Sequence, residues 1–144
     1  MSEDISIKQK KKFSLIELLM IIMLVGIIIT FTVPLQTAKK NKEKLSEAIV
    51  NLQKIARIDV NFKNNPNGGD GDYAMIIDQL NLQKNPDIKM KYFDYSVTDT
   101  TIVAVTNKNF GKTGAGVFFY LPEGPFGLTD NPESKKVFDA NWLP

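Results

Sequence analysis

Residues 13–34 read FSLIELLMIIMLVGIIITFTVP, and this stretch governs how the rest of the chain is interpreted. Nearly every position from Phe13 to Val33 is apolar, and Glu17 is the one ionisable side chain among them. A helix rises about 1.5 Å per residue, so the stretch spans roughly 31 Å, close to the ~30 Å hydrocarbon core of a membrane. No small-residue cleavage pattern follows it, so we expect a retained membrane-spanning helix rather than a cleaved secretory signal.

Composition limits what the 144-residue chain can do. It contains no cysteine and no histidine, which excludes disulfides, zinc sites built from these residues and the nucleophilic triads that need them. The net charge of +2 is too small to indicate a nucleic-acid partner, and no phosphate-binding loop occurs. Lysines instead cluster at positions 8–12 and 39–44, on both flanks of the apolar stretch, as at membrane interfaces. We therefore expect neither an enzyme nor a nucleic-acid-binding protein.

Three residues distinguish the apolar stretch from a plain membrane anchor. Glu17 places a carboxylate near its start, and a charge inside a membrane costs a few kcal/mol and usually marks function. Gly26 weakens the helix, and Pro34 removes a backbone hydrogen bond to the carbonyl of Thr30. We expect the segment between Gly26 and Pro34 to unwind where neighbouring groups satisfy its freed backbone groups. Hydropathy alone also permits a plain anchor.

The apolar stretch leads into an amphipathic pattern with spacings of three and four residues, which predicts a helix. The apolar positions of this pattern are Leu45, Ala48, Ile49, Leu52, Ile55, Ile58 and Phe62. No strong breaker lies between Pro34 and Lys63, so one bent helix is expected from about Phe13 to about Lys63. Its first half is apolar all round, and its second half carries one apolar stripe on which a globular head can pack.

Beyond the helix, β-branched and aromatic residues predict a small antiparallel sheet. The expected strands are Tyr92–Thr98, Thr101–Asn107 and Val117–Leu121. Before them, Tyr73–Leu82 is expected to be a short helix or turn that directs Ile76, Ile77 and Leu80 towards the core. After them, Phe138 and Trp142 are expected to dock the tail onto the head. The predicted fold class is α+β, with a long N-terminal helix packed on three or four antiparallel strands.

The segment Lys11-Lys12-Phe13-Ser14-Leu15-Ile16-Glu17-Leu18-Leu19, its apolar continuation and Pro34 resemble the processing site of type IV prepilins and pseudopilins. The likeness covers roughly residues 8–38. It implies a pilin-like fold with a basic leader at 1–12, a transmembrane or filament-core helix at 13–35 and a globular head at 36–144. It also implies a helical homopolymer. Each subunit would be a single-pass inner-membrane protein before assembly and part of an extracellular or periplasmic filament afterwards.

The resemblance implies a role for the residues around the processing site. In the family, a prepilin peptidase cuts off the leader and methylates the new N-terminal phenylalanine, which places the cut between Lys12 and Phe13. Glu17 resembles the carboxylate that pairs with the N-terminal amine of a neighbouring subunit, because two charges that are costly alone in lipid form a charge-assisted hydrogen bond together. The chain departs from the family at Lys12, where glycine is usual. Without the cut, Lys10, Lys11 or Lys12 is the second candidate partner of Glu17.

A second, shorter likeness concerns the tail. The string Asp139-Ala140-Asn141-Trp142 is loosely similar to the end of major pseudopilins, whose C-terminal loop binds calcium. The similarity implies Asp130 and Asp139 as candidate calcium ligands, and an ordinary docked tail is the alternative. No other cofactor is expected.

Three functions remain open at this point. The first is a structural subunit of a type IV pilus, with membrane lipid, the peptidase and an inner-membrane assembly platform as further partners. The second is a pseudopilin of a type II secretion system, slightly favoured by the lack of cysteine because many pilins close a C-terminal loop with a disulfide. The third is a single-pass anchored domain that binds a partner and never polymerises.

Overall fold

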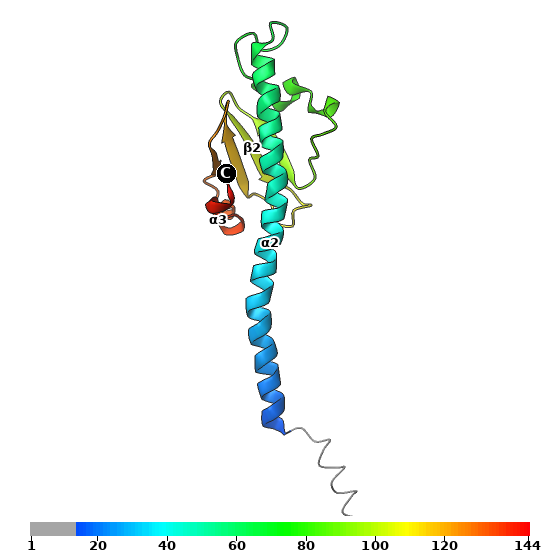
Figure 1. Ribbon diagram of the computed structural model, residues 1–144, viewed down its shortest axis with the longest axis vertical. Helices are drawn as coiled ribbons and strands as arrows, with labels where there is room; N and C mark the ends of the chain where they lie inside the picture. The colour runs from blue at the N-terminus through cyan, green and yellow to red at the C-terminus, as the bar shows by residue number, and fades with distance from the viewer. Residues whose placement is uncertain (1–13) are drawn as a thin grey trace, which may run out of the picture. The chain divides into compact units, whose positions relative to one another are not determined.

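A computed structural model describes residues 14–144 of the chain (Figure 1). The chain divides into two compact units, Met1–Thr37 and Ala38–Pro144, and one helix, α2 (Leu15–Asn64), contributes to both. The remaining elements, in chain order, are η1 (Ile77–Leu80), η2 (Leu82–Lys84), β1 (Phe93–Val97), β2 (Thr101–Thr106), β3 (Gly116–Tyr120), β4 (Phe126–Leu128), α3 (Pro132–Val137) and η3 (Ala140–Trp142). The predicted α+β fold class is confirmed.

The long helix predicted from the sequence is present with nearly the expected bounds. From Ala38 onwards α2 buries one stripe, made of Leu45, Ala48, Asn51, Leu52, Ile55, Ala56 and Asp59. The apolar members recur at the expected three- and four-residue spacing, which keeps them on one face of the helix. Asn51 and Asp59 share that face, and the apolar pattern alone did not reveal their burial.

The four strands form one antiparallel sheet in the order β1-β2-β3-β4. Strand β1 alternates buried and exposed positions, so Phe93, Tyr95 and Val97 face the core. The predicted hairpin is confirmed as β1 and β2, and the predicted third strand begins one residue earlier, at Gly116. The fourth strand, β4, lies in the tail and pairs with β3 through Val117 and Leu128.

One hydrophobic core, contained in residues 38–144, joins the sheet to the buried stripe of α2. Its fully buried members include Leu45, Leu52, Ile55, Phe93, Ile102 and Val117. Each such side chain stabilises the fold by roughly 1.5–3 kcal/mol relative to exposure. The expected docking of the tail is confirmed, because Phe138 is buried and stacks on Phe93 at 6.0 Å between ring centroids. Trp142 packs partly buried against the same core.

Polar side chains of α2 also attach the segment before β1 to the helix. The two carboxylate oxygens of Glu47 accept hydrogen bonds from the backbone N–H groups of Lys91 and Tyr92, both at 3.0 Å. The Asn51 amide donates to the Lys89 carbonyl at 2.8 Å and to the Tyr95 hydroxyl at 2.9 Å. These bonds satisfy backbone groups of a segment that has no strand partner of its own.

One core prediction is wrong. Leu80 is buried and Ile77 packs against the core, but Ile76 is 57% exposed. Ile76 precedes η1 in an extended conformation, and its backbone N–H donates to the side chain of Gln79. The first and last residues of η1, Ile77 and Leu80, therefore face the core, whereas Ile76 lies before the 3-10 turn begins.

Candidate functional site on the apolar helix

The first unit presents an apolar helical surface that nothing in the described chain covers. Every side chain from Leu15 to Leu35 is exposed, and the large apolar ones are 47% to 76% exposed. By length and composition, α2 is the one helix among the described residues that is long and apolar enough to cross a membrane. A surface of this extent in water is unfavourable, so it indicates contact with lipid, with another protein surface, or with both.

Glu17 lies in the first turn of α2, on this apolar surface. Its backbone N–H donates to the hydroxyl of Ser14 at 3.2 Å, and the N–H of Leu18 bonds to the Ser14 carbonyl at 3.1 Å. Ser14 is therefore the N-cap of the helix. A serine followed three residues later by glutamate is a known helix-start signature. The sequence thus contains a local signal for this cap, which hydropathy and apolar spacing by themselves do not reveal.

The segment between Gly26 and Pro34 is helical in the single chain. The Thr30 hydroxyl donates to the Gly26 carbonyl at 2.7 Å, and the Thr32 hydroxyl donates to the Ile28 carbonyl at 2.6 Å. Such back-bonding gives carbonyl oxygens in the turns before Pro34 a side-chain donor and tends to bend helices. A Cβ added at Gly26 would meet no atom within 4 Å, so the space around this glycine is open. Unwinding on contact with other chains stays a prediction.

The predicted processing residues Lys12 and Phe13, and the alternative partners Lys10 and Lys11, lie outside the described residues 14–144.

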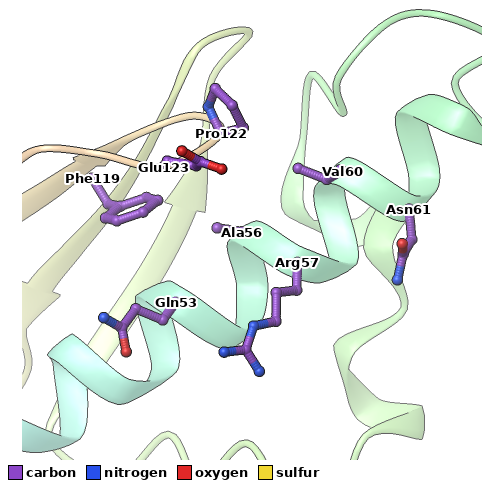
Figure 2. Close-up of a pocket in the computed structure, with 8 residues that line it drawn as sticks. All are labelled: Gln53, Ala56, Arg57, Val60, Asn61, Phe119, Pro122 and Glu123. Atoms are coloured by element: carbon purple, nitrogen blue, oxygen red, sulfur yellow. The ribbon is translucent and has the colours of Figure 1, made fainter.

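In the second unit, a groove runs between α2 and the turn that follows β3 (Figure 2). It has a volume of about 430 Å³ and is lined by Gln53, Ala56, Arg57, Val60, Asn61, Phe119, Pro122 and Glu123. Figure 2 shows the Arg57 side chain pointing away from Glu123. The two opposite charges on the walls of the groove are thus not paired with each other.

The tail acids predicted as calcium ligands have different surroundings. Asp139 caps η3, with one carboxylate oxygen accepting the Asn141 N–H at 2.9 Å, whereas Asp130 is exposed just after β4. Residues 14–144 contain no cluster of three or more Asp, Glu, His or Cys side chains that could hold a metal. Calcium binding by the pair stays a prediction.

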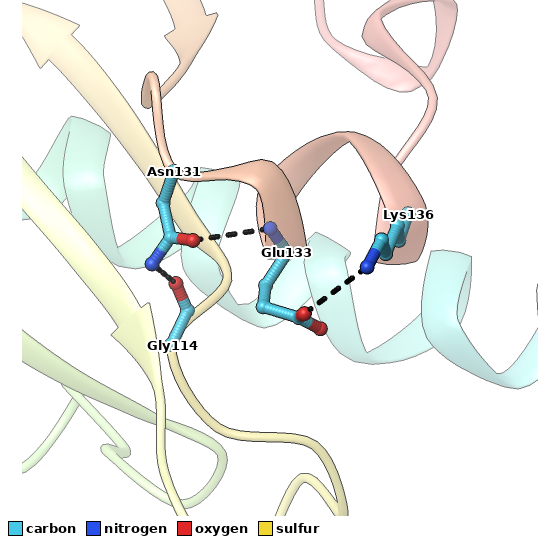
Figure 3. A network of polar contacts seen from close by, with 4 residues as sticks. All are labelled: Gly114, Asn131, Glu133 and Lys136. Carbon is cyan, nitrogen blue, oxygen red and sulfur yellow. Dashed lines mark hydrogen bonds and ion pairs between the residues drawn. The ribbon is translucent and has the colours of Figure 1, made fainter.

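Asn131 holds the start of the segment between these two acids, which contains α3 (Figure 3). Its amide donates to the Gly114 carbonyl at 2.7 Å, and its side-chain oxygen accepts the Glu133 N–H at 3.1 Å, which caps α3. Glu133 also forms an ion pair with Lys136 at 3.5 Å. This network fastens the start of α3 to the loop before β3.

The fold and the site together define an α+β protein with an apolar N-terminal helix that is long enough to span a membrane and carries one carboxylate in its first turn. No protein-family model and no curated protein matches the chain.

Proposed function

We propose that this chain is a structural, non-catalytic subunit of a type IV pilus-like filament that assembles through its apolar N-terminal helix. The observation that supports this proposal is the uncovered apolar surface from Leu15 to Leu35 with Glu17 in its first turn. Lipid covers such a surface before assembly, and the helices of other copies cover it in a filament. The single carboxylate distinguishes this helix from one that needs only lipid.

Glu17 favours assembly, because its carboxylate is less costly when it is paired with a cation. A carboxylate in an apolar environment is costly when alone and much less so when it accepts charge-assisted hydrogen bonds from a cation. In the filament that cation comes from a neighbouring copy, either the amine of Phe13 after cleavage or a lysine at positions 10–12 of an uncleaved chain. The ion pair stabilises stacked subunits and fixes the register of adjacent helices.

Replacing the carboxylate tests this function. We expect Glu17→Ala to lower the amount of filament sheared from the cell surface by at least about tenfold, while the chain stays in the membrane fraction. Glu17→Gln, which keeps the shape and removes the charge, should behave similarly. The measurement is electron microscopy and immunoblotting of sheared material. Filaments at wild-type levels in both variants would contradict the role of Glu17, and a wild-type chain that never forms fibres would contradict the pilus function.

Mass spectrometry of the native N-terminus tests processing separately. A methylated chain that begins at Phe13 is expected if the peptidase accepts Lys12 before the cut. A chain beginning at Met1 or Ser2 would contradict cleavage and would leave the lysine ammonium groups as the partners of Glu17.

The lack of cysteine favours one second candidate, a pseudopilin of a type II secretion system. Such a subunit would form a short periplasmic filament instead of a surface fibre. Absence of surface fibres together with loss of secretion on deletion of the chain would favour this candidate.

A further inference from the structure

The second half of α2 leaves one face free. The sheet and the segment before β1 cover the face that carries Leu45, Leu52 and Ile55. The exposed stripe, defined by its spacing of alternately four and three residues, consists of Lys39, Glu43, Ser46, Val50, Gln53 and Arg57. A stripe that repeats every 3.5 residues faces a single direction along the helix, so one neighbouring helix can contact all of its members.

The acids of this part of the helix differ in whether they have partners. Glu47 accepts two backbone hydrogen bonds and Asp59 is fully buried. Glu43 alone is exposed, and its carboxylate forms no hydrogen bond or ion pair within residues 14–144. An acid on the free face without a partner in its own chain is available to a cation from outside.

Several cations of the same part of the helix also have partners. Lys44 donates to the Phe110 carbonyl at 2.9 Å, Lys54 donates to the Asp87 carbonyl at 3.0 Å, and Lys63 lies over the ring of Tyr73. Arg57 differs from these three lysines, because its guanidinium group has no hydrogen bond, ion pair or ring contact within residues 14–144. Lys39, Lys40 and Lys42 also have no such partner there.

Arg57 is also the one arginine in the whole sequence, in which every other basic residue is lysine. Its side chain stands on the helix wall of the groove and points away from Glu123 (Figure 2). A guanidinium group binds a carboxylate through two parallel hydrogen bonds, a geometry that lysine cannot reproduce.

We propose that Arg57 of one copy pairs with Glu43 of a neighbouring copy, so that the exposed stripe of α2 forms an interface between heads. This inference rests on the proposed filament, in which neighbouring copies of α2 run parallel. Glu43 and Arg57 lie about 21 Å apart along the helix axis. When two parallel copies are offset by that distance, the guanidinium group of one copy lies at the same height along the axis as the carboxylate of the other copy.

The position of Val50 fits the same interface. It lies on the stripe between the two charged residues and is 46% exposed, so it can form apolar contact at the centre while the ion pairs lie towards the ends. Lys39 of a neighbouring copy, which belongs to the same stripe, is the alternative cation for that carboxylate. A charge-exchange experiment separates the two.

The experiment compares Arg57→Glu, Glu43→Arg and the double variant in the full-length chain. Like charges facing each other across an interface are strongly unfavourable, so we expect each single variant to lower sheared filament by at least about tenfold. The double variant exchanges the two charges and should recover filament to within about threefold of wild type. Lys112→Glu, an equal charge change on an exposed residue outside the stripe, is the matched control and should leave filament levels unchanged.

The outcomes distinguish this inference from the proposed function. If the wild-type chain forms no filament, the proposed function is contradicted, and so is the interface that rests on it. If Glu17→Ala abolishes filaments while the Arg57 and Glu43 single variants assemble normally, only the interface is overturned. A double variant no better than either single variant also overturns the pair and leaves Lys39 as the cation for Glu43.

Crosslinking keeps the test valid if a charge variant fails to accumulate in the membrane. The chain has no cysteine, so Glu43→Cys with Arg57→Cys introduces the only two thiols. Because the contact joins the Arg57 end of the stripe in one copy to the Glu43 end in the next, it is heterologous, and a short bis-maleimide should produce a ladder of multimers. The pair Glu43→Cys with Lys112→Cys should give no ladder, and an equal ladder from both pairs would contradict the proposed contact.

Discussion

At the scale of single residues, Asp59 is the polar group whose surroundings are least favourable. It is fully buried in α2; one carboxylate oxygen accepts the Ala74 N–H at 2.9 Å, and the other has no partner within the described chain. Burial raises the pKa of Asp59, and the hydrogen bond from Ala74 opposes this effect. The folded chain therefore holds this proton more tightly than the unfolded chain.

This difference predicts the direction of a pH effect. A raised native pKa contributes stability that is fully present below the unfolded aspartate pKa and is lost as the pH rises through the native value. Asp59→Asn keeps an oxygen for Ala74 and removes the buried charge. We expect it to raise the free energy of unfolding at pH 7 by on the order of 1 kcal/mol, with a smaller gain at about pH 5.

Thermal unfolding of the full chain in detergent micelles, followed by circular dichroism, measures both values. Asp59→Ala is the comparison, because it removes the charge but leaves the Ala74 N–H without its acceptor, and it should be less stable than Asp59→Asn. A gain for Asp59→Asn that is larger at pH 5 than at pH 7 would contradict the assigned direction of the pKa shift.

At the scale of elements, the pairing of β3 with β4 depends on a glycine. Phe118 lies opposite Gly127 in the register, and a Cβ at Gly127 would collide with the Phe118 ring. The same ring packs edge to face with Tyr120 at 4.9 Å between centroids. An aromatic ring over a glycine covers exposed backbone at the sheet edge, so the short strand β4 is held by this contact as well as by its ladder.

Gly127→Ala is expected to destabilise the fold by about 1–3 kcal/mol, because the added methyl displaces the ring. In a Phe118→Ala background the same substitution should cost much less, since the obstacle is gone. Chemical denaturation of the four chains of this double-mutant cycle measures the coupling. Additive effects would show that the ring does not determine the glycine requirement.

At the scale of the whole molecule, the chain separates into two units with different surfaces. The hydrophobic core lies within residues 38–144, whereas the apolar side chains from Leu15 to Leu35 are exposed. The stability of the head should therefore not depend on the apolar half of the helix.

Removing residues 1–37 tests this independence. We expect residues 38–144 to be soluble, monomeric and cooperatively folded, because the buried stripe of α2 and the whole sheet remain. Size-exclusion chromatography with light scattering gives the mass, and thermal unfolding gives the cooperativity. A fragment that aggregates, or that melts without a transition, would show that the head needs the first unit.

Much of this organisation was predictable from the sequence, because it depends on properties of contiguous residues. The length and apolarity of residues 13–34 predicted a helix of membrane-spanning length, and the three- and four-residue spacing after Leu45 predicted its buried stripe. Alternation and β-branching predicted the hairpin of β1 and β2. Glu17 was expected in the first helical turn because it lies near the start of the apolar stretch 13–34.

Only the tertiary structure decided which polar groups are free and which are used. Glu43, Glu47 and Asp59 look alike in sequence, yet one is unpaired within the described chain, one binds backbone groups more than forty residues later, and one is buried. Strand β4 likewise exists because β3 offers a partner edge, and its three residues carry little strand signal of their own. Local patterns determine elements, whereas partners distant in the chain determine pairing, burial and the charges left for other copies.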